Sequence, residues 1–451
     1  MNNTNIIEGN PTKKFFIEMI TRDISIEDAI IDLLDNSIDG ANKINSENYE
    51  GLIVNIVINS SEFIIEDNCG GFSLETAQKY AFRFGRPAEA PNDNNTIGRF
   101  GIGMKRSLFK IGKYFEVETQ TNEDHFKVDV DVEKWSRQQR VVTDDNGKQI
   151  TIDDWNFHYS IIEDQRLLAN GTRIKVINLN NEVKDLFVDD AFLRDLANDI
   201  QKLLNFSLLK GITIILNGKK LSGQRIDMLY SDTLIPFHVS GSINNVSYRI
   251  IAGLGEIGEP KRSGWYIYCN NRLVLEADQT SITNWGISPI PQWHINYVMF
   301  RGLLFLDSKE TLDLPLTTTK KGIDTTSEIY KKILPLMKMA MISVMDFLKK
   351  IPSLEDPNNY RLLLCENSTK ISANELKDYD FKEHPEKLFT SPELDLEAIS
   401  HRQGKVRIAF DTDKDLADNA KSHADAKSYK ELGKIVFDYY VHMEDIQNEE
   451  S

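Results

Sequence analysis

The chain has 451 residues, which is enough for two or three domains with a sizeable hydrophobic core. Hydrophobic residues make up 41% and charged residues 27%, as in an ordinary globular protein. The formal net charge of -16 excludes a general attraction to nucleic acid or to an anionic membrane. DNA binding therefore has no support from net charge, and any site for a polyanion must be local.

The three cysteines, Cys69, Cys269 and Cys365, stand far apart and form no CxxC pair, which is typical of a reducing cytoplasm. The eight histidines show no metal-type spacing. No apolar run is long enough to span a bilayer, and the first residues, "MNNTNIIEGNPTKKFF", lack the basic and apolar regions of a signal peptide. We therefore expect a cytoplasmic protein without a membrane partner.

The stretch "SIEDAIIDLLDNSIDGAN", residues 25–42, is predicted to be a helix that begins at a capping-box-like Ser25 and Asp28. Its apolar residues follow helical spacing, and a polar stripe runs along the opposite side. Within that stripe, Asp32 and Asn36 are one helical turn apart. A carboxylate at Asp32 can orient or deprotonate a water, and the amide oxygen of Asn36 can ligate Mg²⁺. Taken alone, such a stripe is more often a solvated face.

Residues 51–67 are predicted to form a β-hairpin that turns near residues 59–61. The second strand ends at Asp67, which is followed by Cys69, Gly70 and Gly71. A buried carboxylate there can accept a hydrogen bond from an exocyclic amine, and glycine lets a flat ring approach the backbone. The alternative is a plain turn, because Asp, Asn and Gly dominate turns.

A second helix is expected over residues 73–85, followed by a connector rich in Gly, Pro and Asn, "GRPAEAPNDNNTIGRFGIG". Gly98, Gly101 and Gly103 lead into a third helix, and Lys105 lies in its first turn. Backbone N–H groups and the helix dipole at such a start favour a phosphate. No GxxxxGK[ST] motif is present, so this is not a Walker A loop. A further Gly-Thr pair, ending at Thr172, opens the predicted strand "GTRIKVINL".

Taken in this order, the motifs resemble those of the GHKL ATPase superfamily, which includes gyrase, MutL, the ninety-kilodalton heat-shock chaperones and histidine kinases. "DLLDNSIDGA" resembles the MutL and MORC form of the first motif, and "GRFGIGMKRSLFKIG" is most similar to MORC-type ATPases and their prokaryotic relatives. "ITIILNGKK" and "YIYCNNRLV" resemble parts of the transducer domain that follows the ATPase in these proteins. The resemblance covers roughly residues 10–345.

The resemblance implies an α/β fold in which a GHKL (Bergerat) α/β sandwich is followed by an α/β transducer-like domain. The four predicted segments are an ATP-binding domain at 1–185, a transducer-like domain at 186–350, a linker with short helices at 351–403, and a small C-terminal element at 404–451. That last element, a predicted strand and two helices, is similar to a ribbon-helix-helix module. Three aspartates near its strand have the wrong sign for DNA, so we expect a dimerisation or docking element.

The resemblance also implies roles for single residues. Asp32 takes the place of the family's catalytic glutamate, Asn36 that of the Mg²⁺ ligand, and Asp67 that of the adenine-binding aspartate. Gly71 keeps the second glycine of the family's Gly-x-Gly, whereas Cys69 replaces the first. Because Asp is one methylene shorter than Glu, and a shift of ~1 Å can cost ~10²-fold in rate, we expect slow hydrolysis.

Further positions follow from the same resemblance. Gly98, Gly101, Gly103 and Lys105 map onto the lid that covers the phosphates, and Thr172 maps onto the residue that supports the adenine through a water. "LPLTTTKKGID", residues 314–324, resembles the loop that sends a lysine to the γ-phosphate, with Lys320 as the first choice and Lys321 as the second.

These expectations describe a Mg²⁺-dependent ATPase that acts as a switch or clamp, forms a homodimer on binding ATP, and works on DNA or a partner protein, in DNA transactions or antiviral defence. One alternative is a nucleotide-sensing adaptor that binds ATP with little turnover. A histidine-kinase-type protein kinase is a weaker alternative, because no histidine precedes His125 as a phosphoacceptor upstream of the site.

Overall fold

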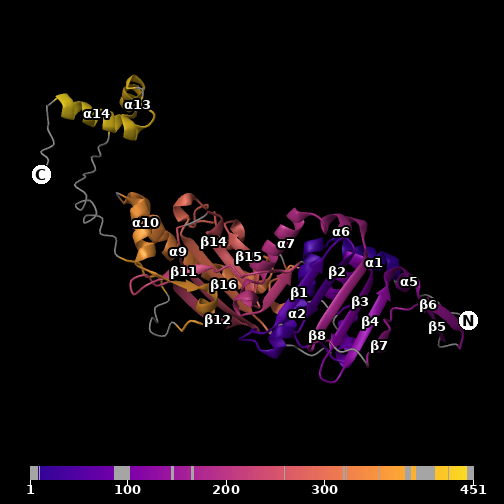
Figure 1. Ribbon diagram of the computed structural model, residues 1–451. Coiled ribbons are helices and arrows are strands. Elements are labelled where there is room, and N and C mark those ends of the chain that lie inside the picture. Colours follow the sequence, from indigo (N-terminus) through magenta and orange to yellow (C-terminus); the bar gives the residue numbers. More distant parts are fainter. Residues whose placement is uncertain are drawn as a thin grey trace, which may run out of the picture. The chain divides into compact units, whose positions relative to one another are not determined.

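The computed structural model describes residues 9, 11–85, 102–143, 147–163, 167–257, 260–317, 320, 322–354, 356–380, 388–392, 412–424 and 426–443. The chain divides into two units, Met1–Pro392 and Glu393–Ser451, and each is described by itself (Figure 1). Among the described residues, the first unit holds two large sheets, two two-stranded sheets and their helices, and the second holds two helices.

The first sheet has eight strands in the order β10-β9-β1-β2-β8-β3-β4-β7 (Figure 1). Every neighbouring pair is antiparallel except β1 and β9, which run parallel. The strand bounds are β1 Ile53–Ile58, β2 Glu62–Asp67, β3 Gly112–Gln120, β4 His125–Asp131, β7 Tyr159–Ile161, β8 Gly171–Leu179, β9 Thr213–Leu216 and β10 Lys219–Lys220. A separate hairpin is formed by β5 Gln139–Thr143 and β6 Gln149–Asp153.

Helices accompany this sheet. They are α1 Lys13–Arg22, α2 Ile26–Ile44, α3 Leu74–Thr76, α4 Gly103–Ile111, α5 Val132–Arg137, α6 Asn181–Leu186, α7 Asp190–Leu203 and α8 Asn205–Leu209. The predicted helix at 73–85 begins at its Ser73 cap as expected, but after one α-helical turn it continues as a π-helix, η1 Ala77–Ala81. The predicted lid glycines Gly98 and Gly101 lie outside the described residues.

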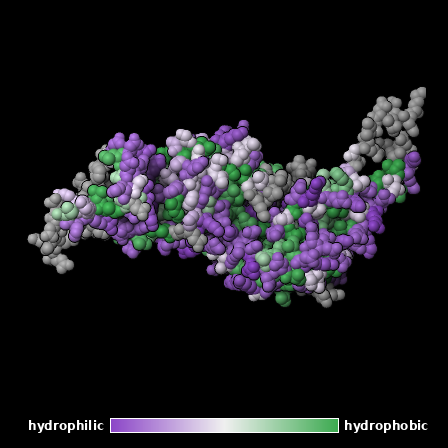
Figure 2. All heavy atoms as spheres, turned by 90° about the horizontal axis from the view of Figure 1, so that it is seen from above, coloured by the Kyte–Doolittle hydropathy of each residue, from purple (hydrophilic) through white to green (hydrophobic). Residues whose placement is uncertain are grey.

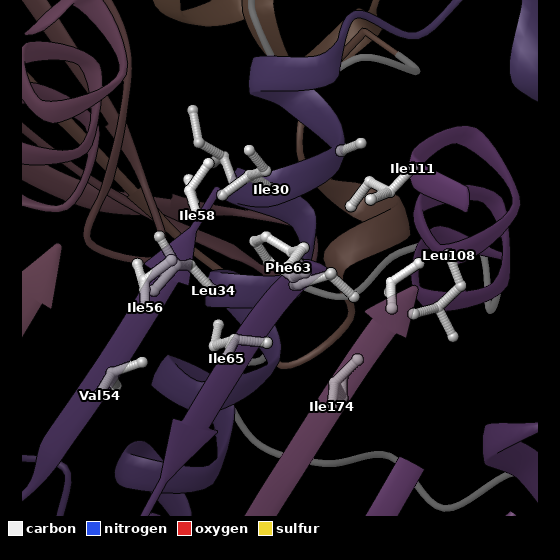
Figure 3. Packing of buried hydrophobic residues seen from close by; sticks show 14 of the residues in the cluster. Ile30, Leu34, Val54, Ile56, Ile58, Phe63, Ile65, Leu108, Ile111 and Ile174 are labelled. Atoms are coloured by element: carbon white, nitrogen blue, oxygen red, sulfur yellow. The ribbon is translucent and has the colours of Figure 1, made fainter. Parts of the chain in front are cut away.

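Helix α2 begins where the sequence predicts, because the Ser25 hydroxyl accepts a hydrogen bond from the Asp28 backbone N–H at 3.1 Å. Ile30 and Leu34 are buried on its inner side against residues of β1 and β2 such as Phe63 (Figure 3). Leu108 and Ile111 of α4 enter the same core (Figure 3). Burial of these side chains stabilises the fold by about 1.5–3 kcal/mol each, so α2 and α4 are held firmly over the sheet.

The second sheet has five strands in the order β12-β13-β16-β14-β15. Their bounds are β12 Phe237–Ile243, β13 Val246–Leu254, β14 Gly264–Cys269, β15 Arg272–Asp278 and β16 Phe300–Asp307. The predicted long helix is present as α9 Glu328–Leu348, which packs against β13 through fully buried residues such as Ile333 and Met337. Short 3₁₀ turns lie at Pro260–Arg262, Ser281–Thr283, Ile295–Tyr297, Thr311–Asp313 and Ile351–Ser353.

The structure places two segments differently from the prediction. Strand β9, expected in the domain at 186–350, pairs with β1 and buries Ile214 and Leu216 in the first core, so the first sheet extends to Lys220. The segment at 351–403 was expected to be a linker with short helices. The short helices are present as α10 Pro357–Glu366 and α11 Ala373–Asp378, but the segment is part of the first unit up to Pro392: β17 Thr369–Ser372 pairs with β11 Asp227–Tyr230 in a separate two-stranded sheet. Ala373 and Leu376 are buried in the core of the second sheet, so α11 packs against that sheet.

In the second unit, the two predicted helices are present as α13 Lys414–His423 and α14 Tyr429–Met443. The strand predicted before them lies outside the described residues. Neither helix contains a buried residue. Of the helices described, none has the length and apolar character needed to cross a bilayer. On the face shown in Figure 2, hydrophilic residues predominate and hydrophobic ones occur in smaller patches.

Candidate active site

Asp32 lies on α2 at the centre of a buried cluster of charges. Its Oδ2 accepts a hydrogen bond from Arg106 Nη2 of α4 at 2.6 Å, and its Oδ1 accepts one from Lys320 Nζ at 3.1 Å. Asp32 is 6% exposed and Lys320 is 7% exposed. The structure therefore brings together two residues that are 288 positions apart in the sequence, the predicted base and the predicted sensor lysine.

Lys320 reaches this position from a tight loop between Leu316 and Ile323, which form an isolated β-bridge. The Thr317 N–H donates to the Gly322 carbonyl at 3.1 Å, and the Lys320 N–H donates to the Thr317 carbonyl at 3.0 Å. Lys320 itself has φ of 57°, a left-handed conformation that costs a non-glycine residue about 1–2 kcal/mol. Lys321, the second choice for the sensor, lies outside the described residues.

Two residues that the sequence analysis did not single out complete the cluster. Asp35 Oδ2 accepts a hydrogen bond from Lys320 Nζ at 2.9 Å, and it also accepts one from Arg272 Nη1 of β15. Arg272 is 3% exposed and Asp35 is 1% exposed. The polar stripe of α2 is therefore no solvated face at these positions, because a loop and a strand of the second sheet cover it.

The charges in this cluster shift one another's pKa values. Burial by itself raises the pKa of Asp32, but Lys320 and Arg106 outweigh burial and hold the pKa below its ordinary value. Burial lowers the pKa of Lys320, against the opposing effect of Asp32. Burial also lowers the pKa of Arg272, to about 10. Asp32 is therefore ionised at neutral pH, and its two cations make it a weak base in this arrangement.

Asp67 lies at the end of β2, and its carboxylate is held by three hydrogen bonds. Ser37 Oγ donates to Oδ2 at 2.7 Å, and the backbone N–H groups of Cys69 and Thr172 donate to Oδ1 at 2.9 and 3.2 Å. Burial raises the pKa of Asp67, and these hydrogen bonds partly offset the effect. An ionised carboxylate offers about four acceptor positions, so one remains for an N–H donor of a ligand.

The glycines around Asp67 are explained by close backbone packing. Gly71 has φ of 65°, and a Cβ there would lie 2.3 Å from the Gln120 carbonyl oxygen. A Cβ on Gly171 would lie 1.9 Å from the Asp67 carbonyl oxygen. This packing accounts for both glycines without a ligand, and the expectation that Gly71 makes room for a ring stays a prediction.

Cys69, which replaces the family's first glycine, is buried against α2. A Cβ on Gly40 of that helix would lie 2.6 Å from the Cys69 carbonyl oxygen, so Gly40 supplies the space at this contact. Burial raises the pKa of the Cys69 thiol, so it is protonated at neutral pH. The cysteine therefore packs as a small apolar side chain beside Asp67.

Helix α4 begins next to the predicted base. A Cβ on Gly103 would lie 3.5 Å from Asp32 Oδ2, which places the helix start beside that carboxylate. Lys105 points elsewhere: its Nζ donates to the Ala81 carbonyl at 2.8 Å and lies 5.8 Å from the Phe84 ring centroid. Burial lowers the pKa of Lys105 to about 7. Arg106, and not Lys105, is the cation of this turn that reaches the cluster.

Phosphate and Mg²⁺ are the groups that the resemblance implies near Asp32. Arg106, Lys320 and Arg272 donate hydrogen bonds to the carboxylates of Asp32 and Asp35, and Arg106 and Lys320 are cations of the kind that pair with a phosphate. The Asn36 side chain is exposed on the same helix, and its amide oxygen is a ligand that Mg²⁺ accepts. In the part of the chain that the structure describes, no three His, Cys, Asp or Glu side chains could hold a metal.

A cavity of about 760 Å³ lies elsewhere in the first domain, lined by residues of η1, by Phe82–Gly85, by Phe126 and Val128 of β4, and by residues 155–157 and Tyr159. None of these lining residues is one of the predicted site residues. Its wall ends at Gly85, next to residues 86–101, which the structure does not describe. We assign no ligand to it.

Sequence reasoning missed four contributors: Ser37, Asp35, Arg106 and Arg272. Ser37 and Asp35 are neighbours of Asn36, and Asp35 lies three residues after Asp32, so helical spacing could have placed it beside the base. Arg106 is adjacent to Lys105, and no signal in the sequence separates the two cations. Arg272 is 237 residues from Asp35, and no local pattern predicts their contact.

Comparison with known proteins agrees with the motifs. Residues 24–160 match the family model described as "Histidine kinase-, DNA gyrase B-, and HSP90-like ATPase". No curated protein matches the chain. The matched segment contains Asp32, Asn36, Asp67 and Lys105, whereas Thr172 and Lys320 follow it. The match confirms the superfamily, and closeness to MORC or MutL stays a prediction. Residues 24–160 of this chain are an ATP-binding domain of the GHKL ATPase superfamily.

Proposed function

We propose that the protein is a Mg²⁺-dependent ATPase that works as a molecular switch, with Asp32 as general base and Lys320 as the residue that reports the γ-phosphate. Asn36 would bind Mg²⁺, Asp67 would accept a hydrogen bond from the adenine amine, and Thr172 would support the adenine. Gly71 and the lid residues Gly98, Gly101 and Gly103 would keep the roles that the family resemblance implies. Lys105 would have to leave the Ala81 carbonyl to act in the lid.

One observation carries this proposal. Lys320 follows the last strand of the second sheet in the sequence, yet its Nζ lies 3.1 Å from Asp32 Oδ1 of the ATP-binding domain. A cation in this place is within reach of a phosphate bound beside the helix start at Gly103. Ordering a segment on a γ-phosphate is an established way to switch a protein between two states. The contact thus supports communication between nucleotide and second domain.

The cations also support a simple account of how the base is controlled. Each oxygen of Asp32 accepts one hydrogen bond from a cation, Oδ2 from Arg106 and Oδ1 from Lys320, and these two positive charges lower the affinity of the carboxylate for a proton. Arg106 and Lys320 would turn toward the more highly charged phosphate, and Asp32 would regain basicity as they leave. Hydrolysis would therefore begin only after both cations have been drawn to the nucleotide.

Replacement of Lys320 by alanine tests the proposal. We expect the Lys320→Ala variant to bind ATP nearly as well as the wild type and to hydrolyse it about 10-fold to 100-fold more slowly, because a single charge contact in a dry site is lost. The measurement is steady-state phosphate release with and without Mg²⁺, with ATP affinity determined separately.

The matched control is Lys338→Ala, since Lys338 lies on α9 and its Nζ donates to the Ser288 carbonyl, away from the cluster. It should hydrolyse ATP at the wild-type rate. Equal turnover of wild type and Lys320→Ala would remove the proposed role from Lys320. A wild type that binds ATP with Mg²⁺ but shows no turnover above Asp32→Ala would favour the nucleotide-sensing adaptor instead.

We further propose that ATP binding closes two copies of the chain into a homodimer and that the clamp acts on DNA or on a partner protein, in DNA transactions or prokaryotic defence. The net charge of -16 favours a protein partner over DNA. The C-terminal helices support a docking role, because α14 exposes a row of large apolar side chains, among them Ile435, Val436, Tyr439 and Tyr440.

The homodimer is tested by the mass of the protein in solution. We expect a monomer without nucleotide and a dimer with a non-hydrolysable ATP analogue. In the Asp67→Arg variant, a cation replaces the adenine acceptor, so the analogue should no longer change the mass. A single mass in all nucleotide states would contradict the clamp.

A further inference from the structure

We propose that Asp35 is a positioning residue that holds Lys320 beside Asp32 and is itself held in place by Arg272 of the second sheet. The inference rests on the proposed function, because it describes how the same site is assembled across two domains. It goes beyond that function by assigning roles to Asp35 and Arg272, two residues to which the resemblance described above assigns none.

Residues from three elements of the fold meet at one oxygen atom of Asp35. Asp35 Oδ2 accepts hydrogen bonds from Lys320 Nζ and from Arg272 Nη1, so α2, the 316–323 loop and β15 meet there. The same Lys320 Nζ also donates to Asp32 Oδ1 at 3.1 Å. The position of the amine is thus fixed by two carboxylates that lie three residues apart on one helix.

Without Asp35, like charges would meet. Arg272 lowers the pKa of Lys320, which shows that the two cations repel each other, and only Asp35 binds both of them among the described residues. Arg106 is bound to Asp32, and Asp28 and Asp39 of α2 raise the pKa values of Arg272 and Lys320 respectively by their negative charge. Removing the Asp35 charge would therefore push Lys320 away from Asp32.

The ion pair between Asp35 and Arg272 has features of a functional contact more than of a stabilising one. Buried ion pairs add little net stability unless their remaining polar atoms are satisfied, yet Asp35 Oδ1 and Arg272 Nε are buried without a hydrogen-bond partner. Lys320 also holds a left-handed backbone conformation, which persists only where contacts fix it. The Asp35 contact is one that can hold the loop in this strained form.

Competitive amine labelling tests the proposal without nucleotide. The full-length protein would be treated with a trace of acetic anhydride, and labelling at each lysine would be measured by mass spectrometry. A Lys321→Arg background leaves one amine in the segment around Lys320. In the Asp35→Asn variant we expect labelling of Lys320 to rise about tenfold, because local opening of the loop exposes the amine.

Two other buried lysines in the first domain serve as internal controls. Lys13 and Lys105 are 1% and 2% exposed, and neither contacts Asp35 in the hydrogen bonds that the structure gives. Their labelling should stay within about twofold of wild type, since a local effect leaves the rest of the core closed. Unchanged labelling of Lys320 in the folded variant would overturn the proposal.

Asp35→Asn could loosen the whole fold, in which case Lys320, Lys13 and Lys105 would all be labelled faster. The double variant Asp35→Leu with Arg272→Met then tests the proposal. It removes both charges, leaves no stranded ion, and keeps side chains of similar volume. Lys320 should again label faster than in wild type, while Lys13 and Lys105 should not. Protection of Lys320 as in wild type would overturn the proposal. The conservative variant Arg272→Lys keeps the positive charge beside Asp35, so Lys320 should keep most of its wild-type protection from labelling.

A turnover measurement separates this proposal from the proposed function. If wild type hydrolyses ATP, Asp35→Asn should lower kcat and leave KM for ATP within about threefold, because positioning of a residue used in the transition state is lost. If wild type hydrolyses none, the proposed function fails while the labelling test still stands. If wild type hydrolyses ATP but Lys320 is labelled as in wild type in Asp35→Asn and in the double variant, the positioning role of Asp35 is wrong and the proposed function still stands.

Discussion

We expect the Asp32→Asn variant to lose ATP turnover by about 10²-fold to 10⁴-fold, the usual contribution of a positioned general base. Asparagine keeps the shape of the side chain but cannot take a proton from water. ATP affinity should be retained or should rise, because Arg106 and Lys320 lose the carboxylate that now occupies them and become available to the phosphates. Single-turnover hydrolysis and equilibrium binding would measure the two effects separately.

The matched control is Glu27→Gln, which removes one carboxylate from the first turn of the same helix and should leave turnover unchanged. The direction in which the ATP affinity of Asp32→Asn changes shows whether Asp32 also contributes to binding. A loss of both affinity and turnover in Asp32→Asn would mean that Asp32 organises the binding site. Turnover close to that of wild type would transfer the role of base to another residue.

The elements that carry Asp32 and Asp67 could be predicted from sequence because their signals are local. Helix α2 has a cap at Ser25 and apolar residues at helical spacing, and both are present in the structure. The β1–β2 hairpin was predicted with its turn, and Asp67 lies at its end. Lys320 was placed by family resemblance alone, since nothing in its own segment indicates what it contacts.

Tertiary contacts account for what sequence reasoning could not reach. Strand β9 is apolar, as predicted, but its parallel pairing with β1 joins segments about 160 residues apart, for which no periodicity gives evidence. The π-helix at Ala77–Ala81 has no signature in the residue pattern, whereas the hairpin β5–β6 was overlooked although Asn146 and Gly147 stand between its two strands in the sequence. Asp35 was passed over because polar residues on a helix are usually solvated, and here a second domain covers them.

The largest effect on stability is expected for Arg272→Ala, which should lower the free energy of unfolding by about 3–5 kcal/mol. The reason is that Asp35 is 1% exposed, and without Arg272 it keeps Lys320 as its only hydrogen-bonded cation among the described residues. Removing one partner of a buried pair leaves a charge that water cannot reach. Urea unfolding followed by circular dichroism and by tryptophan fluorescence would measure the loss.

Arg225→Ala is the matched control, because Arg225 belongs to the same domain and pairs with Asp227 at 3.2 Å, but its side chain is 54% exposed. An exposed pair contributes only about 0–1 kcal/mol, so this variant should unfold nearly as wild type does. The double variant Asp35→Leu with Arg272→Met should regain most of the stability, since it removes the stranded carboxylate along with its partner. If Arg272→Ala were no less stable than Arg225→Ala, Asp35 would have to be protonated or hydrated when Arg272 is missing. Lys320 would then be held at Asp32 without help from Arg272, and the positioning role of the second sheet would be lost.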